Sequence, residues 1–116
     1  MAGKFSLNKA KDGQFYFCLK ATNGQTILVS EMYKDKRAAL AGIESVRKNA
    51  ATDERFERRT SAKGDPYFIL KAANHQEIGR SEMYSSVSAM EKGIASVKKN
   101  APDAKVEDLT VQDLPH

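Results

Sequence analysis

The chain contains the four-residue sequence SEMY twice, at residues 30–33 and at residues 81–84. When the sequence is shifted by 51 positions, residues 4–54 align without a gap on residues 55–105, and 22 of the 51 aligned positions are identical. This level of identity indicates a duplication, and an internal period constrains the fold before any local pattern does. Two copies are too few for an extended solenoid, so we expect two units that share one core.

Each copy opens with segments in which apolar and polar side chains alternate, which is the period of a β-strand. In the first copy Phe17 and Leu19 fall on one face of such a segment, and Tyr16, Cys18 and Lys20 fall on the other. The expected strands cover residues 4–9, 14–21, 26–31, 55–61, 66–72, 77–82 and 105–110. Asn23-Gly24 is a typical two-residue hairpin turn, whereas Asn74-His75 lacks the glycine and predicts a looser one.

After each SEMY segment the apolar period changes from two residues to about 3.6, which predicts a helix. The apolar stripes of the two expected helices are Ala39, Ile43, Val46 and Ala50, and Met90, Ile94, Val97 and Ala101. Asp35 and Ser88 are the expected N-caps, and Ser88 with Glu91 fits a capping box. Gly42 and Gly93 lie in mid-helix, which favours a close approach to another element.

The order of elements predicts a β-β-β-α-β unit, in which the strand after the first helix also opens the second copy. An α+β fold with both helices on one face of a shared antiparallel sheet buries both stripes. We therefore expect one domain over residues 1–116, with repeats at 4–54 and 55–110 and a tail at 111–116. We also expect a monomer with pseudo-twofold symmetry.

The two copies share motifs with a known family. The pattern F-x-L, then G-Q-F-Y-F-x-L-K-A-x-N-G-Q-x-I-L-x-S-E-x-Y, then G-I-x-S-V-x-x-N-A, resembles the YegP-like family of small, uncharacterised bacterial proteins with a domain of unknown function. The resemblance runs from Phe5 to about Thr110, and it implies tandem β(3)-α-β units whose C-terminal strands are exchanged. Pro66, His75 and Gly79-Arg80 depart from the pattern, and the family supplies no reaction or cofactor.

The composition is that of a soluble, mildly basic domain, with a net charge of +4 and a pI near 9.2. This balance favours acidic partners such as nucleic acid or an anionic metabolite. We expect a cytoplasmic protein that does not enter a membrane, because no long apolar run or signal sequence is present and Cys18 is the only cysteine. We expect no cofactor and no metal, because metal-ligand spacings and glycine-rich phosphate loops are missing.

Glu31 and Glu82 are the acidic residues that both copies retain within SEMY, and we include them among the candidate binding residues. As catalytic residues they would act as general acid and base across the pseudo-twofold axis. In the alternative, the Ser or Glu of SEMY caps the following helix or pairs with Lys20 or Lys71. We expect Met32 and Met83 to fill the core and the two SEMY tyrosines to pack at the strand–helix corner.

Tyr16, Lys20, Tyr67 and Lys71 are the candidate binding residues, because they alternate with the apolar positions and should lie on the sheet face away from the helices. Aromatic rings interleaved with lysines suit stacked bases with nearby phosphates, and they equally suit an anionic metabolite, a protein partner or a simply solvated face. Three hypotheses follow. The first is a non-enzymatic binding domain for an anionic ligand or partner, the second an adaptor or stress-related stabiliser, and the third an enzyme that uses Glu31 and Glu82.

Overall fold

The computed structural model describes residues 3–110, so the tail expected at 111–116 lies outside the described residues. The elements are β1 Lys4–Lys9, β2 Phe15–Lys20, β3 Thr26–Ser30, α1 Lys36–Asn49, β4 Phe56–Thr60, β5 Pro66–Lys71, β6 Glu77–Arg80, α2 Val87–Asn100 and β7 Lys105–Asp108, with a short 3-10 turn at Asp53–Arg55. The α+β class and the β-β-β-α-β order of the repeats are as predicted.

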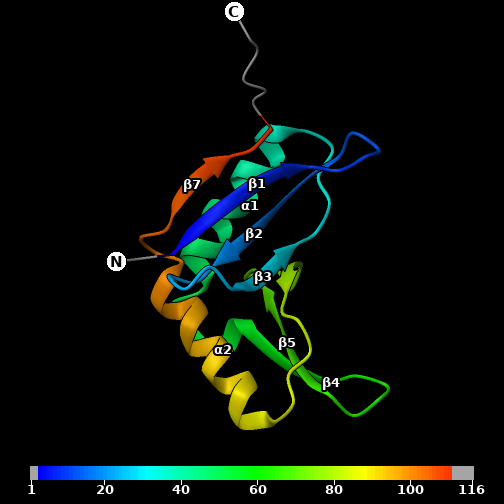
Figure 1. The fold of residues 1–116 in the computed structure, drawn as a ribbon, viewed down its shortest axis with the longest axis vertical. Helices are drawn as coiled ribbons and strands as arrows, with labels where there is room; N and C mark the ends of the chain where they lie inside the picture. Colours follow the sequence, from blue (N-terminus) through cyan, green and yellow to red (C-terminus); the bar gives the residue numbers. More distant parts are fainter. Residues whose placement is uncertain (1–2, 111–116) are drawn as a thin grey trace, which may run out of the picture.

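All seven strands form one sheet, in the order β4-β5-β6-β3-β2-β1-β7. The first repeat supplies β1, β2 and β3, drawn in the upper half of Figure 1, and β4 and β5 lie in the lower half. The halves join where β3 pairs with β6, and Val29 lies opposite Arg80, its own counterpart 51 residues later. A pseudo-twofold axis therefore passes between these two strands.

The strand after each helix crosses into the other repeat. β4 follows α1 and pairs with β5, and β7 follows α2 and pairs with β1. The expectation of a wholly antiparallel sheet is wrong at one pair, because Lys4 and Phe5 lie opposite Lys105 and Val106 in parallel register. β4 is both the exit strand of α1 and the opening strand of the second repeat. In the other half these two roles belong to two strands: β1 opens the first repeat, and β7 follows α2. Since β1 already pairs with β2, β7 pairs with the outer side of β1, parallel to it, and forms the edge of the sheet.

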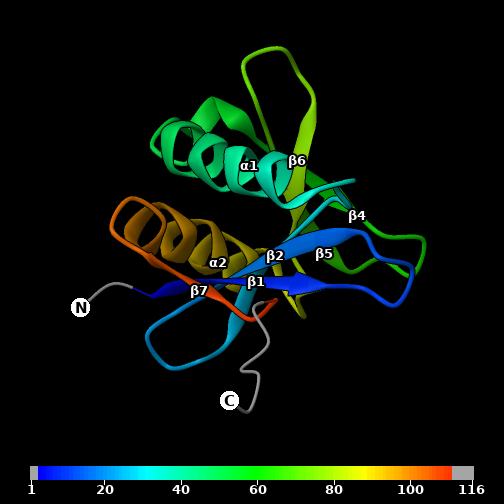
Figure 2. The same cartoon turned by 90° about the horizontal axis from the view of Figure 1, so that it is seen from above.

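Both helices cover the same face of the sheet (Figure 2), with α1 against β2, β5 and β6 and α2 against β3 and β5. Ala39, Ile43 and Val46 of α1 are fully buried, as their helical spacing predicts, and they meet Phe17 and Leu19 of the sheet. A single apolar cluster runs through both repeats, so the two units share one core.

The N-cap of α1 is as predicted, and that of α2 is not. Asp35 accepts a hydrogen bond from the backbone N–H of Ala38 at 2.8 Å. Ser86, not Ser88, caps α2 by accepting from the backbone N–H of Ala89 at 3.1 Å. Ser86 is the counterpart of Asp35 in the duplication, and Glu91, the expected partner in a capping box, binds Arg58 instead.

The SEMY segment holds the strand–helix corner together. In the first copy Ser30 Oγ accepts from the backbone N–H of Phe17 at 2.8 Å and donates to the carbonyl of Glu31 at 2.8 Å. Tyr33 stacks on Phe17, and its hydroxyl lies where a Cβ on Gly42 would stand. The second copy repeats these contacts, which explains why serine, tyrosine and the mid-helix glycine recur.

Two further expectations about the loops are wrong. Met32 and Met83 are 54% and 47% exposed rather than core residues, because they lie between the buried serine and the packed tyrosine of each SEMY segment. The second hairpin keeps the geometry of the first, because His75 adopts the positive φ that Gly24 adopts. Pro66 opens β5, as expected.

Candidate functional site

The sheet face turned away from both helices, called the outer face below, carries the four predicted binding residues of the aromatic and lysine set. Phe17 and Leu19 point into the helix-side core, so Tyr16 and Lys20 project to the outer face. The same alternation in β5 places Tyr67 and Lys71 there. β3 and β6 separate the two sets, so they lie roughly 14 Å apart at an interstrand spacing of about 4.8 Å.

In the first half of the outer face three lysines lie directly opposite one another. Lys4 of β1 is paired in register with Lys20 of β2 on one side and with Lys105 of β7 on the other. Of these three, Lys4 has an acidic partner, Glu107 at 3.1 Å. No carboxylate within residues 3–110 lies within 4.0 Å of the Nζ of Lys20 or Lys105. We call Lys4, Lys20 and Lys105 the lysine row.

In the second half of the outer face, called the paired half below, the basic side chains bind carboxylates. Glu57 binds both Lys71 and Arg59, and these two contacts, in that order, lower the pKa of the Glu57 carboxyl. Glu77 binds Arg80 at 3.0 Å. The counterparts of Glu57 and Glu77 in the first half are serine and threonine, so Lys20 and Lys71 have equivalent positions and different surroundings.

Glu31 and Glu82 line one small cleft of about 270 Å³ beside the pseudo-twofold axis, together with Arg80. Their side-chain partners differ. A hydrogen bond with Glu77, and then burial, raise the pKa of Glu31, whereas Glu82 accepts from the Gln25 side chain at 3.4 Å. Within the described chain neither glutamate caps a helix or pairs with Lys20 or Lys71, and the SEMY serines do not cap a helix either, because Asp35 and Ser86 do so; that alternative is wrong. The serine of SEMY has the structural role.

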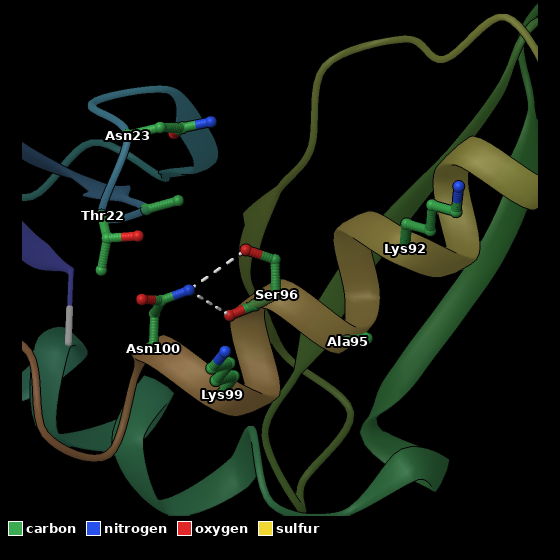
Figure 3. Close-up of a pocket in the computed structure, with 8 residues that line it drawn as sticks. Thr22, Asn23, Lys92, Ala95, Ser96, Lys99 and Asn100 are labelled. Atoms are coloured by element: carbon green, nitrogen blue, oxygen red, sulfur yellow. Dashed lines mark hydrogen bonds between the residues drawn. The ribbon is translucent and has the colours of Figure 1, made fainter. Parts of the chain in front are cut away.

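A second cleft, of about 330 Å³, lies between the β2–β3 hairpin of the first repeat and α2 of the second (Figure 3). Asn100 lies on its floor and is fully engaged: its side-chain amide donates to the carbonyl and hydroxyl of Ser96 at 2.8 and 3.1 Å, and its oxygen accepts from the backbone N–H of Gly3 at 2.8 Å. Lys92 and Lys99 border the cleft with exposed ammonium groups. Sequence reasoning missed both lysines, because the hairpin they face belongs to the other repeat.

The described residues offer little to hold a metal or a nucleophilic site. Residues 3–110 contain no group of three or more His, Cys, Asp or Glu side chains placed to hold a metal ion. Cys18 is half-buried on the outer face, and burial raises its thiol pKa despite the nearby Lys20, which disfavours the reactive thiolate. Neither helix of the described chain is long and apolar enough to cross a membrane.

These features define a class of small α+β proteins in which two β(3)-α-β repeats share one sheet and exchange their C-terminal strands. Both repeats match a domain of unknown function, DUF1508, over residues 10–57 and 61–108, and the chain belongs to this family. The YegP-like resemblance read from the sequence is thereby confirmed.

The relatives carry no assigned activity. The chain is 54% identical to the UPF0339 protein YegP of Escherichia coli over 110 residues, 95% of this chain and 100% of that protein. It is also 54% identical to the UPF0339 protein MS1092 of Mannheimia succiniciproducens over 108 residues, 93% and 96% of the two chains. The solution NMR structure of E. coli YegP, a protein of unknown function, matches with a TM-score of 0.91 at 52% identity over 97% of both chains. That of Shewanella oneidensis SO3888 matches with a TM-score of 0.89 at 47% identity, over 94% of this chain and 92% of that one.

Proposed function

We propose that this protein is a non-enzymatic binding domain that holds an anionic ligand on the first half of its outer face. The lysine row is the observation that carries this proposal. Like charges directly opposite one another on adjacent strands destabilise a sheet, and a bound anion relieves that repulsion. The three lysines stand on adjacent strands about 4.8 Å apart, and their long side chains can bring the ammonium groups to adjacent oxygens of one phosphate-rich ligand.

Tyr16 adds a surface of different chemistry to the same half. It lies four residues before Lys20 on β2, which is about 13 Å along the strand. Its half-buried ring offers a face on which a planar group of the ligand can stack. The proposed site therefore consists of Tyr16 and the lysine row, while Tyr67 and Lys71 belong to the paired half.

A titration followed by NMR chemical shifts tests the proposal, with inorganic polyphosphate and oligo(dT) as the probes. The two repeats supply a matched pair of variants, because Lys20 and Lys71 occupy equivalent positions. We expect Lys20→Gln to weaken binding at least several-fold and Lys71→Gln to leave it nearly unchanged, with the melting temperature of Lys20→Gln close to that of the parent protein. Absence of shifts on the outer face at about millimolar probe, or equal losses in the two variants, would contradict the one-sided site.

A protein–protein adaptor is the second candidate function, and the exposed methionines favour it. Met32 and Met83 occupy equivalent positions and both retain about half of their accessible surface. Methionine is common on surfaces that adapt to several protein partners. An adaptor would bind its partner with little dependence on salt, whereas an anionic ligand on the lysine row would dissociate as salt increases.

A further inference from the structure

The lysine row is one end of a longer basic surface. A cleft of about 600 Å³ adjoins it, and Lys4 and Lys105 line this cleft together with Thr22 of the β2–β3 hairpin. Ala21 and Thr22 also line the cleft of Figure 3, so the two clefts meet at the hairpin. The surface thus leads from the outer face, around the hairpin, to α2 on the other side of the sheet.

The far end of this surface carries two more lysines. Lys92 and Lys99 of α2 border the cleft of Figure 3, where Thr22 and Asn23 face them from the hairpin. No salt bridge joins either ammonium to a carboxylate between residues 3 and 110. The cleft beside Lys4 and Lys105 has one carboxylate in its lining, that of Asp103, and the lining of the cleft of Figure 3 includes none. We call Lys20, Lys4, Lys105, Lys99 and Lys92, in this spatial order, the basic track.

The equivalent surface of the other half is less basic, although Lys71 and Lys48 stand at the positions of Lys20 and Lys99. The cleft between the second hairpin and α1 measures about 540 Å³, and Glu31 and Glu77 line it. Ala41 stands there in place of Lys92, and Ala73 stands at the position of Thr22. Lys105 lies on β7, which has no counterpart beside β4, so the basic track depends both on side chains such as Lys92 and on the extra edge strand of the first half.

We propose that the basic track binds a single-stranded nucleic acid, with phosphates on the five lysines and a base stacked on Tyr16. This inference rests on the proposed function and extends it. The track bends from one side of the sheet to the other, so a flat bilayer cannot contact both ends at once. A duplex with a persistence length of about 150 base pairs cannot follow the bend either. A flexible single strand can, and an aromatic ring beside a basic groove is the usual way to hold one.

The salt dependence of binding tests the length of the track. For a single strand the slope of log K against log salt is about −0.7 per neutralised phosphate, so five contacts predict a slope of about −3.5 and the lysine row alone about −2. Between about 50 and 200 mM salt, affinity should therefore fall about a hundredfold for the full track and about twentyfold for the row alone. Fluorescence anisotropy with a labelled oligo(dT) of about ten nucleotides measures the affinity at each salt concentration, and these affinities give the slope.

Matched variants separate this inference from the proposed function. The double variant Lys92→Gln/Lys99→Gln should reduce the magnitude of the slope by about 1.4. The control is the double variant Lys34→Gln/Lys48→Gln, which removes the same charge beside and within α1 and should leave the slope unchanged. If Lys20→Gln weakens binding but the α2 pair has no effect, the lysine row stands and the track is overturned. If no anionic probe binds, both are overturned. If polyphosphate and oligo(dT) bind with equal affinity, and if Tyr16→Leu binds oligo(dT) as tightly as the parent protein does, the assignment to nucleic acid is overturned.

Discussion

Leu7 and Arg58 occupy equivalent positions in the two repeats, yet Leu7 is fully buried whereas the side chain of Arg58 is 35% exposed. β7 covers the edge of β1, and the backbone N–H of Leu109 donates to the carbonyl of Leu7 at 2.9 Å. β4 has a neighbour on one side and forms the other edge of the sheet. Arg58 binds Glu91 at 2.6 Å and Asp53 at 3.1 Å, so the free edge carries charges that discourage pairing with another strand.

We predict that Arg58→Leu makes the protein associate with itself, because the substitution removes an inward-pointing charge from an exposed strand edge. The sedimentation coefficient should rise with protein concentration for this variant and stay constant for Arg59→Leu, which changes a residue on the outer face of the same strand. A strictly monomeric Arg58→Leu protein at high concentration would show that the charge does not protect the edge.

The SEMY serines should be structural. Ser30→Ala leaves the buried backbone N–H of Phe17 without its acceptor, and an unsatisfied buried donor costs roughly 1–3 kcal/mol. We expect a loss of unfolding free energy of about that size, measured by urea denaturation. Ser81→Ala should cost a similar amount, because Ser81 Oγ accepts from Phe68 at 3.0 Å. Ser88→Ala serves as a control and should cost little, since Ser88 is exposed.

Gly42→Ala should destabilise the protein although alanine is the better helix former by about 1 kcal/mol. A Cβ at this position would lie 2.4 Å from the Tyr33 hydroxyl and 3.0 Å from the Phe17 ring, so side chains in a packed region must shift, at about 1–3 kcal/mol. In a Tyr33→Ala background the penalty should shrink, because the nearest atom is gone. A double-mutant cycle of unfolding free energies measures the coupling. Equal penalties in both backgrounds would refute the clash.

The attachment of β7 should weaken in acid. A hydrogen bond from Lys36, and then one from Thr110, lower the pKa of Asp108 to about 2 from its ordinary 3.8. Because the folded-state pKa is the lower one, the carboxylate stabilises the fold above the ordinary pKa, and this contribution is lost as pH falls from about 4 towards 2. The protection factors of the β1–β7 amides, which are corrected for the intrinsic pH dependence of hydrogen exchange, should fall over that range. Asp108→Asn should show low protection factors at neutral pH and no further fall of these factors in acid.

The shared core predicts that the chain unfolds as one domain. β4 and β7 each join the sheet half of the other repeat, so neither repeat can unfold without breaking strand pairs of its partner. Calorimetric and van't Hoff enthalpies of thermal unfolding should therefore agree. Two separated transitions, one for each repeat, would contradict the single domain.

Much of the fold could be read from local patterns. The alternation that buries Phe17 and Leu19, the helical stripe of Ile43 and Val46, and the duplication itself are each visible within a few tens of residues. The predicted N-cap of α2 was wrong because two nearby residues suit the same role. Ser86 and Ser88 are both suitable caps by type, and the helix start that the packing selects decides between them.

The candidate site was only partly readable. The alternation placed Tyr16 and Lys20 on the outer face, but Lys4 and Lys105 were not singled out, because their register joins opposite ends of the chain. Lys71 looked equivalent to Lys20 in the sequence, and its salt bridge to Glu57 depends on the register of the β4–β5 hairpin, which the alternation of side chains does not specify.

The sequence by itself determined the two repeats, the order of their elements and the side of each strand that faces the core, since hydrophobic periodicity is local and survives in any fold that buries it. The tertiary structure decided that β7 runs parallel to β1 at the edge, that Leu7 is covered where Arg58 is not, and that five lysines from both repeats lie along one surface. These outcomes depend on contacts between segments that lie far apart in the sequence. Such contacts stabilise the protein only after the two units have packed around a common core.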